Sequence, residues 1–174
     1  LSMMSKIDRQ RVEIVLEYPE DSAGGLLNND IISVQKDSTL HLVLEYLRSV
    51  GSIPKNTDKI FVVSKNDQYL GDLSISKILV SEPTLSVREL METDALPIDA
   101  NMNDKDVSIL FEQNDLISAP VIDRNSKLVG RITVDDVVDV IREDADQNLM
   151  SITGIAEDTF AAPARAARSR GVWL

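Results

Sequence analysis

Carboxylate side chains crowd one stretch near the end of this 174-residue chain, and they are the residues whose types could most readily do chemistry. Between Asp135 and Asp158 a single base, Arg142, accompanies eight acids: Asp135, Asp136, Asp139, Glu143, Asp144, Asp146, Glu157 and Asp158. Magnesium is a hard ion that prefers oxygen ligands, keeps several waters and often takes only one or two carboxylates. Acids gathered on facing surfaces would therefore bind it without a tight cage.

The spacing of these acids has two interpretations. Asp135, Asp139 and Glu143 follow one another at intervals of four residues, so on a helix they form a stripe of like charge. Such pairs are mildly destabilising unless a cation screens them. The same pattern is typical of a solvated helix face that aids solubility, and spacing alone leaves both interpretations open.

The chain has few residues that are suited to other kinds of chemistry. Cysteine is absent, which excludes disulfides and thiolate metal sites, and His41 is the only imidazole. Gly24 and Gly25 predict a turn and not a phosphate loop, because no Gly-x-x-x-x-Gly-Lys-Ser/Thr follows. Without a nucleophile beside a base we expect no enzyme, and a magnesium-dependent hydrolase is the least favoured class. The net charge of −11 repels nucleic acids and favours cations as partners.

The elements that position the acids come from a duplicated unit, whose first copy runs from about Leu26 to Ser81 and whose second runs from about Leu90 to Gln147. Each copy predicts a short strand, an amphipathic helix, a hairpin and a second helix. The hairpins lie 59 residues apart, and the first copy carries an insertion around residues 51–59. Neither copy can bury its apolar faces alone, so we expect two β-α-β-β-α repeats with pseudo-twofold packing, an α+β (α/β-type) fold.

Start signals precede the first helix of each copy. Asp37 or Ser38 can cap the first, and Asn103 with Asp106 resembles a capping box for the second. After the second hairpin, Val134, Val137 and Ile141 are spaced as the apolar stripe of a closing helix. Asp135, Asp136, Asp139 and Glu143 then fall on the polar face of that helix.

In its repeat order and its Gly-hydrophobic-hydrophobic-Thr/Ser-x-x-Asp turn, the chain resembles the pair of CBS domains. The turn is visible from Gly130 to Asp136, with Arg131 at the first hydrophobic position. The flanks narrow the family. Tyr18 to Leu26 resembles the segment that enters the CBS pair of MgtE-type magnesium transporters, and Phe160 to Leu174 is similar to the linker helix that leads into their membrane domain.

The resemblance implies a division of the chain. Residues 1–25 would be the end of a preceding helical domain with its linker, 26–82 the first CBS repeat, 83–148 the second, and 149–174 the linker helix towards a membrane domain. We expect no membrane span within the chain itself, because no run of about 18 apolar residues is present. The expected location is the cytoplasmic face of the cell membrane, with the fragment itself soluble.

The resemblance also implies site residues. The family's Asp after Gly-x-x-Thr-Val matches Asp135, and its acids at the head of the linker helix match Glu157 and Asp158. Asp136, Asp139 and Glu143 complete the predicted magnesium-binding set.

In many CBS proteins the residues matching Thr133 and Asp136 contact an adenine nucleotide, although the same pair is also a plain helix cap. In the first repeat Ser74 fits the nucleotide pattern, but Lys77 replaces the carboxylate that would hold a ribose. The described nucleotide site of this family uses the first repeat, so this departure weighs against ATP.

These expectations combine into a regulatory module that senses intracellular Mg²⁺ and gates a pore. It would act as a homodimer, together with amino-terminal and transmembrane domains outside this chain. The alternative is an adenine-nucleotide-sensing CBS module of another transporter or enzyme.

Overall fold

The computed structural model describes residues 17–168, with side chains up to Thr153. Of residues 1–25, expected to be the end of a preceding helical domain with its linker, only 17–25 lie within the described part. The elements run in chain order as follows: β1 (Ser33–Gln35), α2 (Leu40–Val50), β2 (Lys59–Val63), β3 (Tyr69–Ser74), α3 (Ile75–Val80), α4 (Val87–Leu90), β4 (Ile98–Asp99), α5 (Asp104–Gln113), β5 (Ser118–Ile122), β6 (Leu128–Thr133) and α6 (Val134–Arg168).

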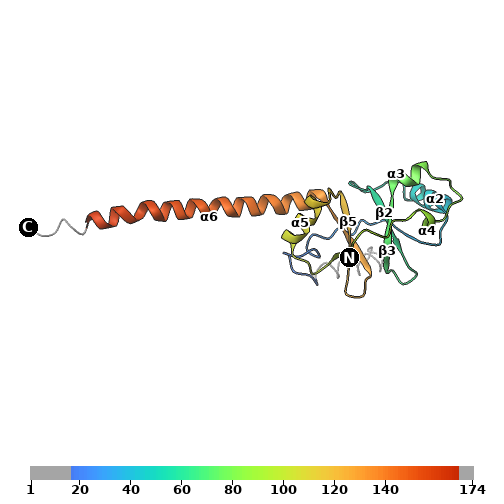
Figure 1. The fold of residues 1–174 in the computed structure, drawn as a ribbon, viewed down its shortest axis with the longest axis horizontal. Coiled ribbons are helices and arrows are strands. Elements are labelled where there is room, and N and C mark those ends of the chain that lie inside the picture. The colour runs from blue at the N-terminus through green and yellow to red at the C-terminus, as the bar shows by residue number, and fades with distance from the viewer. Residues whose placement is uncertain (1–16, 169–174) are drawn as a thin grey trace, which may run out of the picture. The chain divides into compact units, whose positions relative to one another are not determined.

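Two three-stranded sheets of identical topology confirm the predicted duplication (Figure 1). In the first, β1 pairs parallel with β2 and β2 antiparallel with β3; β4, β5 and β6 repeat this arrangement. The irregularity in the hairpin also recurs, between Val62 and Val63 in one copy and between Val121 and Ile122 in the other. The α+β fold with two repeats is therefore confirmed.

Two local expectations were wrong. Thr39, and neither Asp37 nor Ser38, caps α2, because its side chain accepts the hydrogen bond from the Leu42 amide at 3.4 Å. The second short strand, which the repeat predicts over Leu96 to Ile98, begins only at Ile98, because Pro97 has no amide to donate to a sheet. Asn103 does cap α5, accepting from the Lys105 amide at 3.1 Å.

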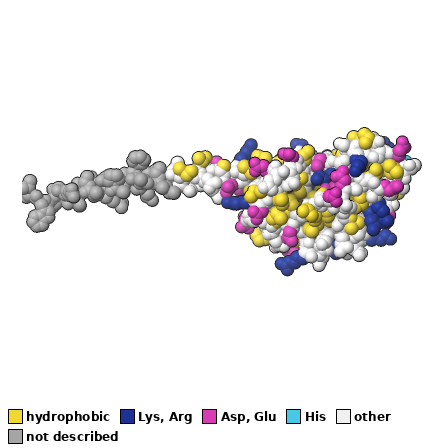
Figure 2. Space-filling model, in the orientation of Figure 1, with side chains coloured by type: hydrophobic (Ala, Val, Ile, Leu, Met, Phe, Trp, Pro, Cys, Tyr) yellow, Lys and Arg dark blue, Asp and Glu magenta, His cyan; other side chains and the backbone are white. Residues whose placement is uncertain are grey.

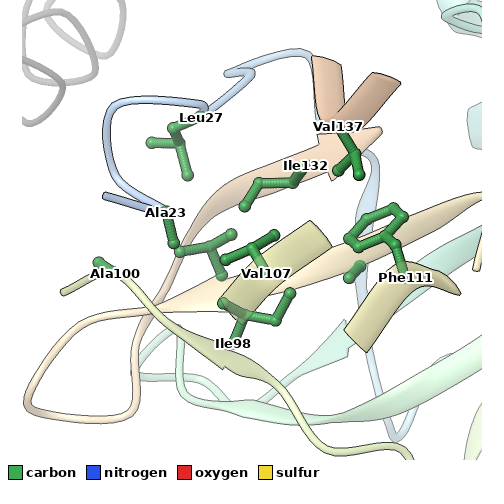
Figure 3. Packing of buried hydrophobic residues seen from close by; sticks show 10 residues of the cluster. Ala23, Leu27, Ile98, Ala100, Val107, Phe111, Ile132 and Val137 are labelled. Atoms are coloured by element: carbon green, nitrogen blue, oxygen red, sulfur yellow. The ribbon is translucent and has the colours of Figure 1, made fainter. Parts of the chain in front are cut away.

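Each repeat completes its core with residues that come before the first strand of the other repeat. Ala23 and Leu27 pack with Ile98, Val107 and Ile132 of the second repeat (Figure 3). Val87 packs in the core of the first repeat, against residues from Ile32 to Ile78. The two copies therefore cannot be separated without opening both cores, which extends the reason for expecting a pair.

Backbone bridges hold each of these segments against the other repeat. Asn28 forms a bridge with Arg131 on β6, and Glu92 forms the equivalent bridge with Asp72 on β3. A glycine precedes each strand partner, because a Cβ on Gly130 would stand 2.6 Å from the Asn28 carbonyl oxygen. On Gly71 it would stand 2.3 Å from that of Glu92. Both repeats thus need glycine where the neighbouring segment crosses.

The chain divides after Val138 into two compact units, and the second consists of the remainder of α6 and the residues that follow. Within the described residues, no helix combines the length and the apolar character needed to cross a membrane.

Candidate functional site

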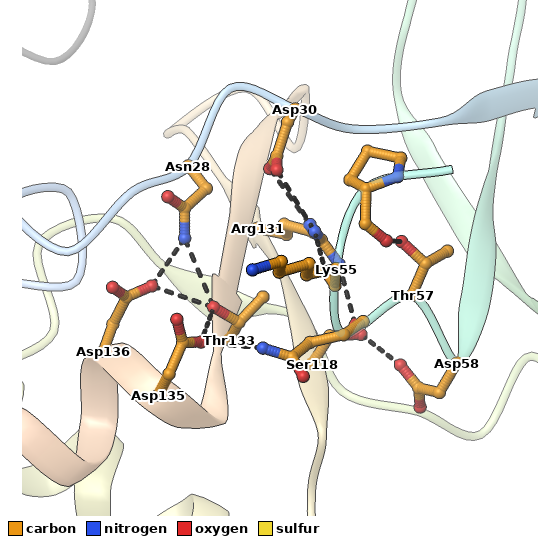
Figure 4. Close-up of polar contacts among 12 residues, drawn as sticks. Asn28, Asp30, Lys55, Thr57, Asp58, Ser118, Arg131, Thr133, Asp135 and Asp136 are labelled. Carbon is orange, nitrogen blue, oxygen red and sulfur yellow. Dashed lines mark hydrogen bonds and ion pairs between the residues drawn. The ribbon is translucent and has the colours of Figure 1, made fainter. Parts of the chain in front are cut away.

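The predicted site residues of the second repeat meet where β6 ends and α6 begins (Figure 4). The hydroxyl of Thr133, the last residue of β6, contacts a carboxylate oxygen of Asp135 and lies 2.9 Å from Oδ2 of Asp136. A threonine hydroxyl has one proton, so it can donate to only one of the two carboxylates at a time. The cluster is therefore rich in acceptors and short of donors.

Two asparagines from the first half of the chain supply part of the missing donors. Nδ2 of Asn56 donates to Oδ1 of Asp135 at 3.1 Å, and Nδ2 of Asn28 donates to Oδ2 of Asp136. The hydrogen bond from Thr133, followed by weaker backbone and Asn56 contributions, lowers the pKa of Asp135 below its ordinary value. Asp135 is therefore a carboxylate at neutral pH.

Arg131 stabilises the segments that carry these asparagines. Its side chain is nearly buried, and Nε and Nη2 donate to the two carboxylate oxygens of Asp30 at 3.2 and 3.3 Å. Nη1 donates to the carbonyl oxygen of Asn56 at 2.8 Å and Nη2 to that of Lys55 at 2.7 Å. The insertion of the first repeat is thereby anchored beside Asp135.

The remaining predicted residues make none of the hydrogen bonds described for this cluster. Ser74 caps α3 by accepting from the Lys77 amide at 3.1 Å. Asp139 and Glu143 lie on α6 in the second unit, where Asp139 is 3.9 Å from Nη1 of Arg142. Asp139 and Glu143 stay predicted magnesium residues.

Glu157 and Asp158 also lie on α6, but their side chains are outside the described residues.

The described residues fit a magnesium ion that keeps most of its water ligands, and they do not fit one that is coordinated mainly by protein groups. Among residues with described side chains, no three His, Cys, Asp or Glu groups gather closely enough to hold a metal. Asp135 and Asp136 share the Thr133 hydroxyl, and two carboxylates suffice for an ion that keeps most of its waters. Further ligands would have to come from side chains that are not described or from another domain.

Sequence reasoning missed Asn28, Asn56 and Arg131, because each acts across more than 70 residues of sequence separation. One signal was available: Arg131 is the one charged residue of the strand β6. Asp72 takes the same place in the first repeat.

Comparisons with known proteins agree with this fold. A CBS domain model matches residues 87–143, which lie within the predicted second repeat. The magnesium transporter MgtE of Bacillus subtilis is 31% identical over the whole chain, and that of Thermus thermophilus is 30% identical over 84% of it. The chain spans 39% and 33% of the length of these two relatives.

Two solved structures are also similar. The cytosolic domain of the Mg²⁺ channel MgtE in complex with ATP gives a TM-score of 0.73 at 31% identity, covering 80% of this chain and 56% of that one. The CBS pair of a putative Mg²⁺ transporter from Shewanella oneidensis gives 0.72 at 26% identity, covering 83% of each chain.

Proposed function

Because this chain belongs to the MgtE family of magnesium transporters, in which it corresponds to the region with the pair of CBS domains, we propose that it senses intracellular Mg²⁺ and gates a magnesium pore. The homology to transporters confirms the expectation that the chain is not an enzyme. Its place would be the cytoplasmic face of the membrane, joined to an amino-terminal and a transmembrane domain of the same protein.

One observation carries the proposal. Asp135 is held ionised at the start of α6 beside a second carboxylate, Asp136, with which it shares one hydroxyl proton. The hydroxyl and asparagine donors that reach this pair are neutral groups, so they leave its negative charge in place, and a hydrated divalent cation would neutralise it. The asparagine contacts of both acids tie this charge to the first half of the chain.

Magnesium would act by bridging pieces of the protein. A ligand shifts a two-state equilibrium only by the difference between its affinities for the two states. Ions shared between acids of α6, Asp135 among them, and a neighbouring domain would exist only in the compact, closed state. When magnesium falls, the unscreened carboxylates repel one another and the open state is favoured.

Limited proteolysis of the full-length protein tests this mechanism. We expect magnesium at millimolar concentration to slow cleavage, and the triple variant Asp135→Asn, Glu157→Gln, Asp158→Asn to lose most of that protection. Three exposed acids outside the predicted set serve as a control with the same loss of charge: Glu20→Gln, Glu82→Gln and Glu112→Gln. Equal protection of both triple variants would refute the role assigned to the acids.

An adenine-nucleotide sensor is the second candidate, because a homologous domain was crystallised with ATP. Against it, Nζ of Lys77 donates to the Leu90 carbonyl oxygen at 3.0 Å and lies 3.3 Å from a carboxylate oxygen of Glu92. The position expected for a ribose-binding carboxylate thus holds a lysine that already has two partners. Calorimetry with ATP, AMP and Mg²⁺, each alone, separates the two functions.

A further inference from the structure

A polar cavity of about 310 Å³ opens at one edge of the first sheet. β1 ends at Gln35 and β2 at Val63, and these two residues pair with each other in the parallel ladder. Because both strands end at this edge, the loop after β1 and the turn after β2 leave the sheet side by side and form the walls of the cavity. Every lining residue belongs to the first repeat, so the cavity shares no residue with the cluster of Thr133, Asp135 and Asp136.

Hydrogen bonds to the backbone hold both walls. In the turn after β2, Oγ of Ser64 accepts from the amides of Asn66 and Gln68, each at 3.2 Å. In the loop after β1, the carbonyl oxygen of Lys36 accepts from the Arg88 amide at 3.0 Å. The walls are therefore in place before any ligand arrives, which reduces the ordering cost of binding.

The cavity carries positive charge in a chain that is acidic overall. Lys36 and Lys65 line it, the first partly buried and the second exposed. Among the residues with described side chains, neither ammonium group has a hydrogen-bond or ion-pair partner. The one acid among the lining residues, Asp37, is compensated by Arg88, whose Nη2 lies 2.5 Å from its Oδ1. The two lysine charges therefore remain available to an anion.

Neutral donors accompany the lysines. The Ser64 oxygen already accepts two hydrogen bonds, so its hydroxyl proton is left to donate. The side-chain amides of Asn66 and Gln68 also line the cavity, and within the described part of the chain they make no hydrogen bond. A phosphate monoester suits such a set, because it offers three acceptor oxygens and a charge of about −1.5 to −2. A carboxylate offers only two oxygens and a single charge.

The second repeat builds the same turn with an acid. Asp123 stands 59 residues after Ser64, the offset that relates the two hairpins. Its side chain accepts from the amides of Asn125 and Lys127 at 2.8 and 3.0 Å, as Ser64 does in its own turn. The turn therefore forms with either residue, and only the first repeat has the neutral one.

The residues after the first strand of each repeat differ in the same direction. Asp99 is the counterpart of Gln35, because the two occupy equivalent positions in the parallel ladders. The next residue is Lys36 in the first repeat and the buried Ala100 in the second. The carbonyl oxygen of Ala100 accepts from the Gly24 amide at 2.8 Å, so the chain itself occupies this edge of the second sheet. The set of groups that suits an anion is thus specific to the first repeat.

We propose that this cavity binds the phosphate group of a small phosphorylated molecule, with Lys36 and Lys65 as the charged groups and Ser64 as the hydroxyl donor. A volume of about 310 Å³ lies at the lower end of the range of about 300–1,000 Å³ that is typical of ligand sites. None of the described residues that line it is aromatic, so a nucleobase would find no ring to stack on. The net charge of −11 favours a dissolved ligand over an anionic membrane surface.

Two three-carbon probes that differ in their anionic group test the proposal. Glycerol 3-phosphate presents a phosphate monoester and glycerate a carboxylate. On the full chain, with EDTA present to remove divalent ions, we expect calorimetry to give at least tenfold tighter binding of glycerol 3-phosphate. The same affinity for both probes, or no binding of glycerol 3-phosphate at millimolar concentration, would overturn the proposal. Since no divalent ion is present, either result leaves the magnesium mechanism to its own test.

Variants locate the site. Ser64→Asp adds a negative charge to the cavity, and the second repeat shows that an aspartate forms this turn, so binding of glycerol 3-phosphate should weaken at least tenfold. Lys36→Gln combined with Lys65→Gln removes the two available charges and should weaken binding at least as much. Arg124→Gln is the matched control, because Arg124 stands 59 residues after Lys65 in the corresponding turn, and it should leave binding unchanged. Equal affinities of the control and the two cavity variants, with thermal unfolding showing that all are folded, would overturn the assignment.

Vesicles distinguish a dissolved ligand from a lipid headgroup. Phosphatidic acid presents the same phosphate monoester at a membrane surface. We expect the chain not to sediment with phosphatidylcholine vesicles that contain phosphatidic acid, under the conditions in which it binds glycerol 3-phosphate. Sedimentation that the double lysine variant loses would overturn the assignment to a dissolved ligand.

Discussion

At the scale of single residues, the two repeats use buried ionisable groups where most strands have apolar ones. Asp72 receives a hydrogen bond of 2.8 Å from the Tyr69 hydroxyl and an ion pair from Lys59. Burial outweighs these two favourable contacts and raises the pKa of Asp72 above its ordinary value. The same environment raises the pKa of Tyr69, first through burial and then through the charge of Asp72.

Replacement of Asp72 by Asn should therefore change how stability depends on pH. A raised carboxyl pKa means that the folded state binds the proton more tightly, so the contribution of Asp72 to stability is present at low pH and is lost as pH rises through its folded-state pKa. Asparagine is neutral over this whole pH range, so the variant does not lose stability in this way. We expect the free energy of unfolding of Asp72→Asn, measured with urea between pH 4 and pH 7, to increase relative to that of the wild type as the pH rises. A difference between the two proteins that does not change with pH would contradict this expectation.

At the scale of elements, the exchange of segments between the repeats could not be predicted from the sequence. Periodicity identified α2, α5 and both hairpins, because each side chain pattern is local. It also located Thr133, Asp135 and Asp136 at a helix start. Nothing local shows that Leu27 packs with the second repeat, that Arg131 reaches Asp30, or that Ser86 starts the short helix α4 with Glu89 as its capping partner.

The crossing of the segments makes a prediction for the glycines that allow it. Gly130→Ala places a methyl group 2.6 Å from the Asn28 carbonyl oxygen, so the segment from Ala23 to Asn28 must shift away from the second core. We expect a loss of about 2 kcal/mol in the free energy of unfolding. Chemical denaturation measures it, with Ser52→Ala in an exposed loop as the control. A loss equal to that of the control would show that the crossing is not tightly packed.

At the scale of the whole molecule, the paired cores join the two repeats into one body. The chain spans only about two fifths or less of its relatives, so the proposed gating role would need a domain outside the chain to act on. Exposed apolar side chains interrupt the charged surface (Figure 2), and α2 carries three of them: Leu42, Tyr46 and Val50, which are 45–55% exposed. Their spacing of four residues places them on one face of the helix.

That face of α2 should contact a second copy of the chain, as expected for a pair of CBS domains. Burying Tyr46 and its neighbours in a dimer removes apolar area from water, whereas a carboxylate at the same position would be buried without a partner. Tyr46→Glu should therefore raise the dimer dissociation constant at least about tenfold, since each factor of ten corresponds to about 1.4 kcal/mol. Analytical ultracentrifugation measures it. Arg48→Glu, two residues on and on the opposite face of α2, should leave the dimer intact; dissociation by Arg48→Glu alone would place the interface elsewhere.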